Sequence, residues 1–264
     1  MAELFKQEFV LNALAASIIM GLLLSYLGVH VVGRGIVFVD LALGQISMLG
    51  VAFAGYIEKD TFLVSIIFTM AGAFFLSLIN IKDKRLKLEA IIGIIYAVAS
   101  AATVLLIAKT PHGEADISEV LFGSLFTVTT DKIFSMGIIF SAIGLAHIIF
   151  RKKFFSLTDR SENAEHIAVF NLWNFLFYLS IGLAIVLAVR MGGVIPVFSY
   201  LIIPAVSAMM IAHKRWLVVL IALVISILSG FVGLVFALHF DFPAGSSLVA
   251  ILCPFFPISP VILI

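Results

Sequence analysis

The sequence contains a single cysteine, Cys253, which excludes an internal disulfide and a metal site built from several thiolates. Within an apolar run this residue is expected to be a small packing side chain. Charged residues make up only 12% of the 264 residues, and the formal net charge is +1. Because nucleic-acid binding needs clustered positive charge, this near balance argues against a nucleic-acid partner.

Motifs that bind nucleotide phosphates or build a catalytic nucleophile are also missing. No Gly-x-x-x-x-Gly-Lys-Ser/Thr run occurs, and neither a nucleophile elbow nor a metalloprotease motif is found. The chain is therefore not expected to be an enzyme, to hydrolyse ATP or to bind a cofactor of its own. A function driven by ATP would require a separate ATPase.

Apolar side chains are abundant instead, at 63% of the residues, and the mean hydropathy is +1.24. Unpaired backbone groups in hydrocarbon cost several kcal/mol each, so spanning runs should be helical. With roughly 20 residues per span, the length allows about nine transmembrane helices (about eight to ten) in an all-α, polytopic bundle that forms one domain over residues 1–264. The runs of near-spanning length cover residues 10–32, 36–57, 62–81, 90–108, 133–150, 172–189, 194–212, 216–238 and 245–264.

The charged residues between these runs predict the orientation. Lys and Arg gather in every second loop, which by the positive-inside rule is cytoplasmic, while acidic residues dominate the opposite loops. The N-terminus is then outside and the C-terminus inside. The basic set is Arg34, Lys82, Lys84, Arg85, Lys87, Arg151, Lys152, Lys153, Arg160, Lys214 and Arg215; the acidic set is Glu58, Asp60, Glu114, Asp116, Glu119, Asp131 and Asp241.

Two segments do not fit a plain row of spanning helices. Residues 117–130 are apolar but too short to span, which favours either a re-entrant or interfacial helix or a partly buried loop. The last run contains Pro254, Pro257 and Pro260, each of which removes a backbone donor. This run is predicted to be kinked or broken.

The longest cytoplasmic connection, residues 151–170, ends in LTDRSENAEHIAVF, which mixes charges with Ala, Ile and Val. This pattern predicts a short amphipathic helix that Ser161 or Asp159 could cap. A rigid helix on the cytoplasmic face could transmit a displacement from a soluble motor protein to the membrane helices. A simple connecting helix would show the same pattern.

Asp40 is a carboxylate within an apolar run, and ionisable groups in spans usually face a cavity or a partner. Gly44 and Gln45 follow four to five residues later and are expected on nearly the same face, with Ser47 about two turns from Asp40. These residues could form a polar stripe along a translocation pathway. Alternatively, Asp40 lies close to the cytoplasmic interface and pairs with Arg34.

Two further groups of candidates come from an outer loop and from the seventh run. His112, Glu114 and Asp116 offer nitrogen and oxygen ligands that suit a divalent cation, although solvated loops often have this composition. In the seventh run, Ser199 and Pro204 could line a pathway, since proline loosens local hydrogen bonding, or could serve close helix packing.

The order of these segments resembles the permeases of ATP-binding-cassette importers for zinc, manganese and iron. Residues 27–54, LGVHVVGRGIVFVDLALGQISMLGVAFA, are similar to the family pattern LGVFLVLRRMSLIGDALSHAVLPGVALA. Residues 120–129 resemble its LLFGSLFTVT, residues 193–208 resemble its GVLLVSALLIIPAATA, and residues 241–251 resemble its DTPAGPAIVL. The resemblance covers nearly the whole chain in order.

This resemblance implies a permease in a prokaryotic inner (plasma) membrane that works as a homodimer or paired permease. Its implied partners are cytoplasmic ATP-binding-cassette ATPases, which use ATP, and an extracytoplasmic substrate-binding protein that delivers a divalent metal ion or a metal chelate. The stretch 159–169 would be the coupling helix that contacts the ATPase, with Asp159, Ala164, Glu165 and Ala168 as its candidate contact residues.

The sequence departs from the family at the Asp-Ala-Leu-Ser-His motif, whose Asp and His resemble a metal relay. Leu41 stands at the Asp position and Gln45 at the His position. The cargo could therefore be a chelate rather than a bare ion. A self-sufficient secondary transporter or channel that uses Asp40 for an ion or proton is the alternative, but it would be expected to show inverted repeats, and no clear repeat is found.

Overall fold

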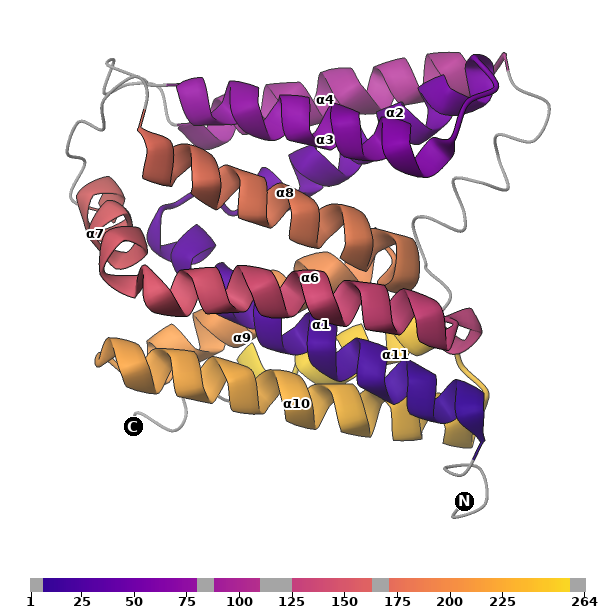
Figure 1. Ribbon diagram of the computed structural model, residues 1–264. Helices are drawn as coiled ribbons and strands as arrows, with labels where there is room; N and C mark the ends of the chain where they lie inside the picture. Colours follow the sequence, from indigo (N-terminus) through magenta and orange to yellow (C-terminus); the bar gives the residue numbers. More distant parts are fainter. Residues whose placement is uncertain (1–6, 80–87, 110–124, 163–170, 257–264) are drawn as a thin grey trace. The chain divides into compact units, whose positions relative to one another are not determined.

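The computed structural model describes residues 7–79, 88–109, 125–162 and 171–256, and these are mostly helical (Figure 1). Within them, 8 helices are long and apolar enough to cross a membrane, which agrees with the predicted all-α polytopic bundle. These helices are α1 (Glu8–Gly33), α2 (Val39–Tyr56), α3 (Thr61–Leu78), α4 (Leu88–Ile107), α6 (Thr130–Ile149), α8 (Leu172–Gly192), α9 (Val194–Ile211) and α10 (Arg215–Phe240). The shorter elements are the 3₁₀ helix η2 (Leu125–Thr127), α7 (Arg151–Glu162) and α11 (Ala244–Leu252).

The ninth predicted run differs from the others. Its described part forms α11, which has only 9 residues and ends at Leu252. A turn at Cys253 and Pro254 interrupts the helix, because proline supplies no backbone N–H and clashes with the preceding turn. The predicted break therefore lies at Pro254, whereas Pro257 and Pro260 lie outside the described residues.

The cytoplasmic connection also differs from its prediction. The helix α7 begins at Arg151, directly after α6, and reaches Glu162. Asp159 and Ser161 therefore lie inside this helix and do not cap its start. Its buried side chains, Phe154, Leu157 and Thr158, recur at the three- to four-residue spacing of an amphipathic helix.

The contacts divide the chain into two compact units. Unit 1 comprises Met1–Val32, Leu121–Leu145 and Ala188–Ile264, and unit 2 comprises Gly33–Val120 and Ala146–Leu187. The long helices α6 and α8 each contribute to both units. Each unit is built from stretches that are distant in sequence, so neither unit could be cut out as one continuous piece of the chain.

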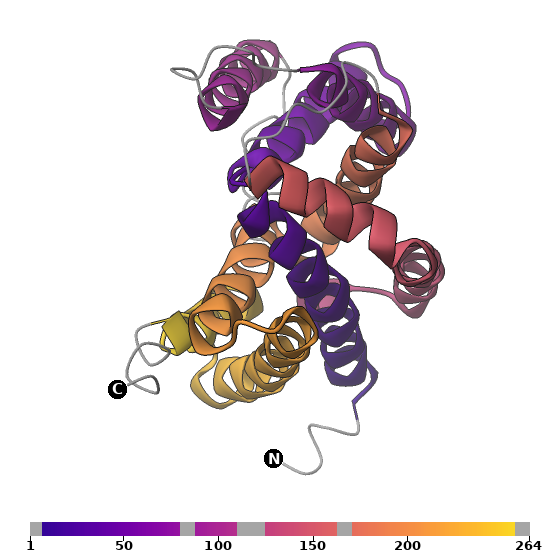
Figure 2. The same cartoon turned by 90° about the vertical axis from the view of Figure 1, so that its left-hand side faces the viewer.

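In unit 1, the helices α9, α10 and α11 lie side by side (Figure 2). Small side chains fill much of the contact between α9 and α10, which lets the helices approach closely. The buried cluster consists of Val29, Ala205, Ala208, Ala212, Val218 and Ala222. The hydroxyls of Ser17 and Tyr200 lie 2.7 Å apart and join α1 to α9 in the buried interior.

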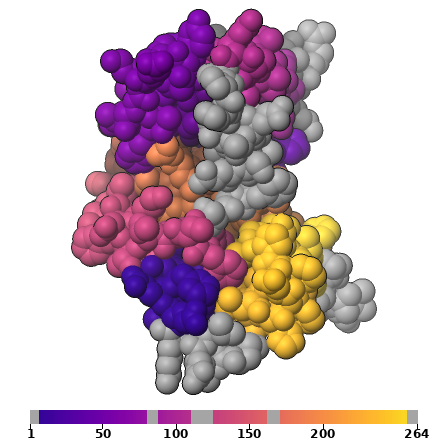
Figure 3. All heavy atoms as spheres, turned by 90° about the vertical axis from the view of Figure 1, so that its right-hand side faces the viewer, coloured from indigo at the N-terminus to yellow at the C-terminus, as the bar shows by residue number. Residues whose placement is uncertain are grey.

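The start of α1 is tied to the start of α6 (Figure 3). The Asn12 amide donates to the Val128 carbonyl at 3.3 Å and to the Thr130 hydroxyl at 3.2 Å. The Thr130 hydroxyl donates to the Glu8 carboxylate at 3.0 Å. These contacts place the two helix starts together, as expected if both lie on the same side of the membrane.

In unit 2, α2 packs against α3 and α4. The rings of Phe53 and Phe68 lie 5.4 Å apart between α2 and α3, and Phe74 of α3 meets Phe175 of α8 at 5.7 Å. Aromatic pairs at such distances contribute more than their buried area alone. The helix α2 is thus held on more than one side.

We expect Gly28→Ala to destabilise the protein. A Cβ atom on Gly28 would lie 1.8 Å from the backbone carbonyl oxygen of Leu201, so α1 and α9 would have to separate. Overpacking of this kind costs about 1–3 kcal/mol. The measurement is the midpoint of thermal unfolding of the detergent-solubilised chain, which should fall.

The matched control is Gly144→Ala in α6, where a Cβ atom would meet nothing within 4 Å. Because alanine favours helix over glycine by about 1 kcal/mol, this variant should unfold at the same or a higher temperature. Equal midpoints for the two variants would contradict the close packing of α1 on α9.

Candidate functional site

The polar candidates Asp40, Gln45 and Ser47 all lie on α2, and all are buried. Their side chains are exposed by 3%, 8% and 3%, respectively. Since burial of a polar group in an apolar medium is costly, three such residues within two turns require a structural or functional reason.

Asp40 does not pair with Arg34. One carboxylate oxygen of Asp40 (Oδ1) and one guanidinium nitrogen of Arg34 (Nη2) each lack a hydrogen-bond partner among the described residues. Asp40 lies in the first turn of α2, where the free N–H groups of a helix start favour a negative charge. The helix start therefore contributes to the stability of this buried carboxylate, and no salt bridge to Arg34 does.

The predicted single polar stripe on α2 is only partly correct. At about 100° per residue, Asp40, Gly44 and Ser47 share one face, whereas Gln45 is turned by about 140° from Asp40. A Cβ atom on Gly44 would meet Ile185 of α8 at 4.0 Å, so the shared face is directed toward α8. Gln45 shares its face with Leu41, four residues earlier, which is half-buried.

The two candidates on α9 belong to unit 1 and have structural partners or roles of their own. The Ser199 hydroxyl donates to the Ile195 carbonyl of the same helix at 2.9 Å. Pro204 lies inside α9 and is buried. Because proline lacks the N–H that would bond to the carbonyl four residues earlier, it loosens the helix one turn after Ser199.

Arg34 occupies a site in unit 2 that the sequence did not reveal. Its guanidinium lies 3.5 Å above the ring of Phe177 and donates to Asn174 at 3.1 Å and to Thr158 at 3.4 Å. Burial lowers the pKa of Arg34 to about 10, which still leaves it charged at neutral pH. A charged group is thus held inside the protein by a ring face and by neutral acceptors.

His147 lies beside this arginine site. Its ring stacks on Phe154 of α7 with 3.9 Å between centroids, and its Nε2 lies 2.9 Å from the hydroxyl of Ser180. The ring of His147 thus joins the end of α6 to α7 and α8. A packing role for this histidine, rather than ligation, agrees with these contacts.

Several candidates lie outside the described residues. Among the proposed coupling residues, Asp159 is half-buried on α7, while Ala164, Glu165 and Ala168 fall in the segment 163–170. The loop ligands His112, Glu114 and Asp116 fall in the segment 110–124. Within the described ranges, no group of three or more His, Cys, Asp or Glu side chains is arranged to hold a metal ion.

Comparison with known proteins identifies relatives of this chain. A family model described as "ABC 3 transport family" matches residues 6–262. The manganese transport system membrane protein MntC of Halalkalibacterium halodurans is 24% identical over 97% of this chain and 88% of its own length. The high-affinity zinc uptake system membrane protein ZnuB of Haemophilus influenzae is 26% identical over 92% of this chain and 93% of its own length.

A solved structure shares the fold over nearly the full length. PsaBC from Streptococcus pneumoniae, determined in complex with Fab, superimposes with a TM-score of 0.80 at 26% identity and covers 97% of this chain and 92% of the matched chain. The similarity extends across the segments that form unit 1 and unit 2.

Proposed function

The chain belongs to the ABC 3 transport family, and on that premise we propose that it carries a divalent metal ion, free or as a chelate, across the membrane by alternating access. It is a multi-pass membrane permease of a bacterial metal-type ABC importer, and ATP is hydrolysed by a separate subunit. Permeases of this family typically bind no cofactor. The observation that carries the proposal is the family match from residue 6 to residue 262, which includes every described helix.

The proposed cargo follows from the relatives and from α2 together. The similar proteins are named for manganese, zinc and iron transport. At the position of the family histidine, Gln45 offers an amide oxygen and an amide donor in place of an imidazole nitrogen, so it should hold a transition metal more weakly. Weaker binding favours a chelate, or an ion that is released readily.

We propose that the cytoplasmic connection couples ATP hydrolysis in the ATPase to movement of the membrane helices. The helix α7 ends at Glu162 and is followed in the sequence by the segment 163–170. We assign contact with the ATPase to Asp159 together with Ala164, Glu165 and Ala168. Because α7 packs within unit 2 through Phe154, Leu157 and Thr158, a displacement of α7 by a soluble subunit would be passed on to the membrane helices.

The proposed assembly includes two further partners. A second permease copy would complete the transmembrane part, and an extracytoplasmic binding protein would deliver the cargo. Large apolar side chains of α4, such as Ile94, Val98 and Leu105, are more than half exposed in the single chain. Lipid or a second permease copy can cover such a surface.

The proposal is tested by transport in proteoliposomes. The permease with its ATPase and binding protein should take up Mn²⁺ or Zn²⁺ only when ATP is supplied, because the chain has no nucleotide site of its own. Ala168→Glu should keep ATPase binding but reduce uptake, since a docking surface tolerates little added volume.

The matched control for Ala168→Glu is Lys109→Gln, at an exposed position on the predicted outer side, which shifts the net charge by the same amount. It should transport normally. Uptake by the permease alone, driven by an ion gradient, would contradict the proposal and favour a secondary transporter based on Asp40.

A second prediction concerns the cargo. Changing Leu41 to Asp and Gln45 to His should recreate the family pair, four residues and about one helical turn apart on one face. The double variant should show increased dependence of ATP hydrolysis on Zn²⁺ or Mn²⁺, measured as the metal concentration for half-maximal stimulation. If the unmodified protein already transports free Zn²⁺ or Mn²⁺ and Gln45→Ala has no effect, Gln45 does not belong to the pathway.

A further inference from the structure

We propose that Arg34 is the positioning residue that transmits movement of α7 to α2, and so links ATP hydrolysis to rearrangement of the helix that carries Asp40 and Gln45. This inference rests on the proposed function. Arg34 lies in the loop that joins α1 to α2, and all of its contacts described here belong to unit 2.

Arg34 is fastened to α7 at two points. Its Nε donates to the hydroxyl of Thr158 at 3.4 Å, and its backbone carbonyl accepts a hydrogen bond from the hydroxyl of Ser161 at 3.3 Å. Both partners are separated from Arg34 by more than a hundred residues of sequence. A displacement of α7 would therefore pull on both the side chain and the backbone of the loop before α2.

The loop after Arg34 can pass this displacement on, because it is packed rather than free. Gly35 adopts a φ of 65°, which allows the chain to turn, and the buried residues Ile36 and Val39 follow it with exposures of 2% and 0%. The Val39 N–H donates to the Ile36 carbonyl at 3.0 Å and joins the loop to the first turn of α2. The loop is held before Gly35 by the contacts of Arg34 and after it by the buried Ile36, so the loop moves together with the first turn of α2.

A second connection reaches α2 through α3. The Asn174 side chain accepts from Arg34 at 3.1 Å and donates through its amide nitrogen to the Ser77 carbonyl at the end of α3, at 3.3 Å. The helix α3 packs closely on α2, where a Cβ atom on Gly72 would lie 2.6 Å from Ile46. Arg34 therefore contacts α7 directly and, through Asn174 of α8, reaches α3, one of the helices that pack on α2.

An arginine is required at this position by the geometry of its contacts. The planar guanidinium stacks on Phe177 while it donates in two directions, and a lysine ammonium cannot combine these contacts in the same way. Arg34→Lys keeps the positive charge and the possibility of a cation–π contact but loses the fork that joins Thr158 to Asn174. It therefore separates the linking role from charge alone.

The test uses the complete complex of permease, ATPase and binding protein in proteoliposomes, with Mn²⁺ as the transported probe. For Arg34→Lys, the amount of Mn²⁺ taken up per ATP hydrolysed should fall about ten-fold, the size expected when a charge-assisted hydrogen bond is lost. Thr158→Val should change the ratio in the same direction but less. The amount of assembled complex should stay unchanged for both variants.

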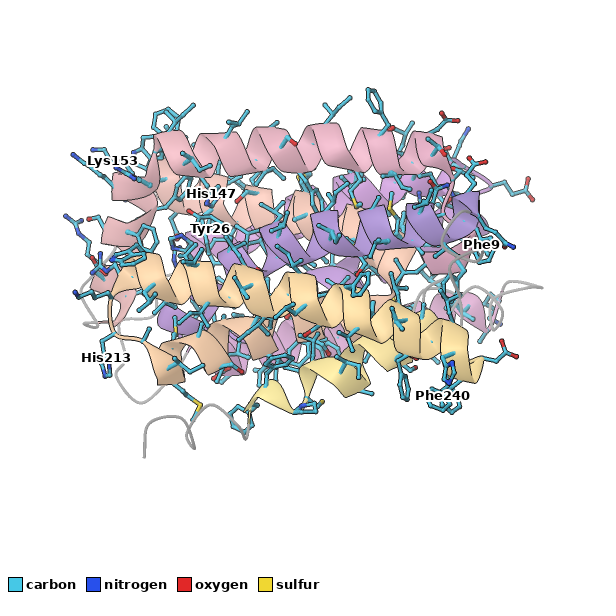
Figure 4. All side chains as sticks on the ribbon, turned by 90° about the horizontal axis from the view of Figure 1, so that it is seen from below. Phe9, Tyr26, His147, Lys153, His213 and Phe240 are labelled. Atoms are coloured by element: carbon cyan, nitrogen blue, oxygen red, sulfur yellow. The ribbon has the colours of Figure 1, made fainter. Side chains whose placement is uncertain are left out.

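The control is Lys153→Gln, on the same helix as Thr158. The Lys153 side chain is exposed and points away from the helices (Figure 4). It should keep the ratio of the unmodified complex. An unchanged ratio for Arg34→Lys would overturn the inference, and so would an equal loss of uptake, hydrolysis and assembled complex, which indicates a purely structural role. If the unmodified complex showed no ATP-dependent uptake of Mn²⁺, of Zn²⁺ or of their chelates, the proposed function itself would fail, and this inference with it.

Discussion

Inside a bilayer no water is available to hydrogen-bond a polar group, so each group must find its partner within the protein. The helices of this chain meet that requirement locally. The hydroxyls of Thr69, Thr103 and Ser226 each donate to the carbonyl four residues earlier in their own helix. A helix whose hydroxyls are satisfied in this way can pack through aromatic side chains, as α3 does with α2.

Among the described residues, two of the buried groups that lack a partner for one polar atom are charged, and both lie close to the start of α2. Arg34 precedes α2 and Asp40 lies in its first turn, yet the two do not pair. Each is stabilised by other means, Arg34 by a ring face and neutral acceptors, Asp40 by the start of a helix.

The spans could be predicted from the sequence because hydropathy reports burial in lipid directly. The interruption of the last run could also be predicted, because proline cannot continue a helix: α11 has 9 residues and is followed by a turn at Cys253 and Pro254. The start of α7 was misjudged, since its basic first turn hides the amphipathic pattern. The contacts of Arg34 could not be predicted, because Thr158 and Asn174 lie 124 and 140 residues away along the chain. Because Asp40 is only six residues from Arg34 in the sequence, Asp40 was considered as its partner instead.

The most direct test of alternating access through α2 is the accessibility of a cysteine placed at Gln45 in a Cys253→Ser background. The rate of its modification by a thiol reagent would be measured in the assembled complex, from each side of the membrane, with and without nucleotide trapped in the ATPase. The proposed mechanism predicts that trapped nucleotide raises the rate from one side and lowers it from the other. Equal rates with and without nucleotide, from both sides, would contradict it.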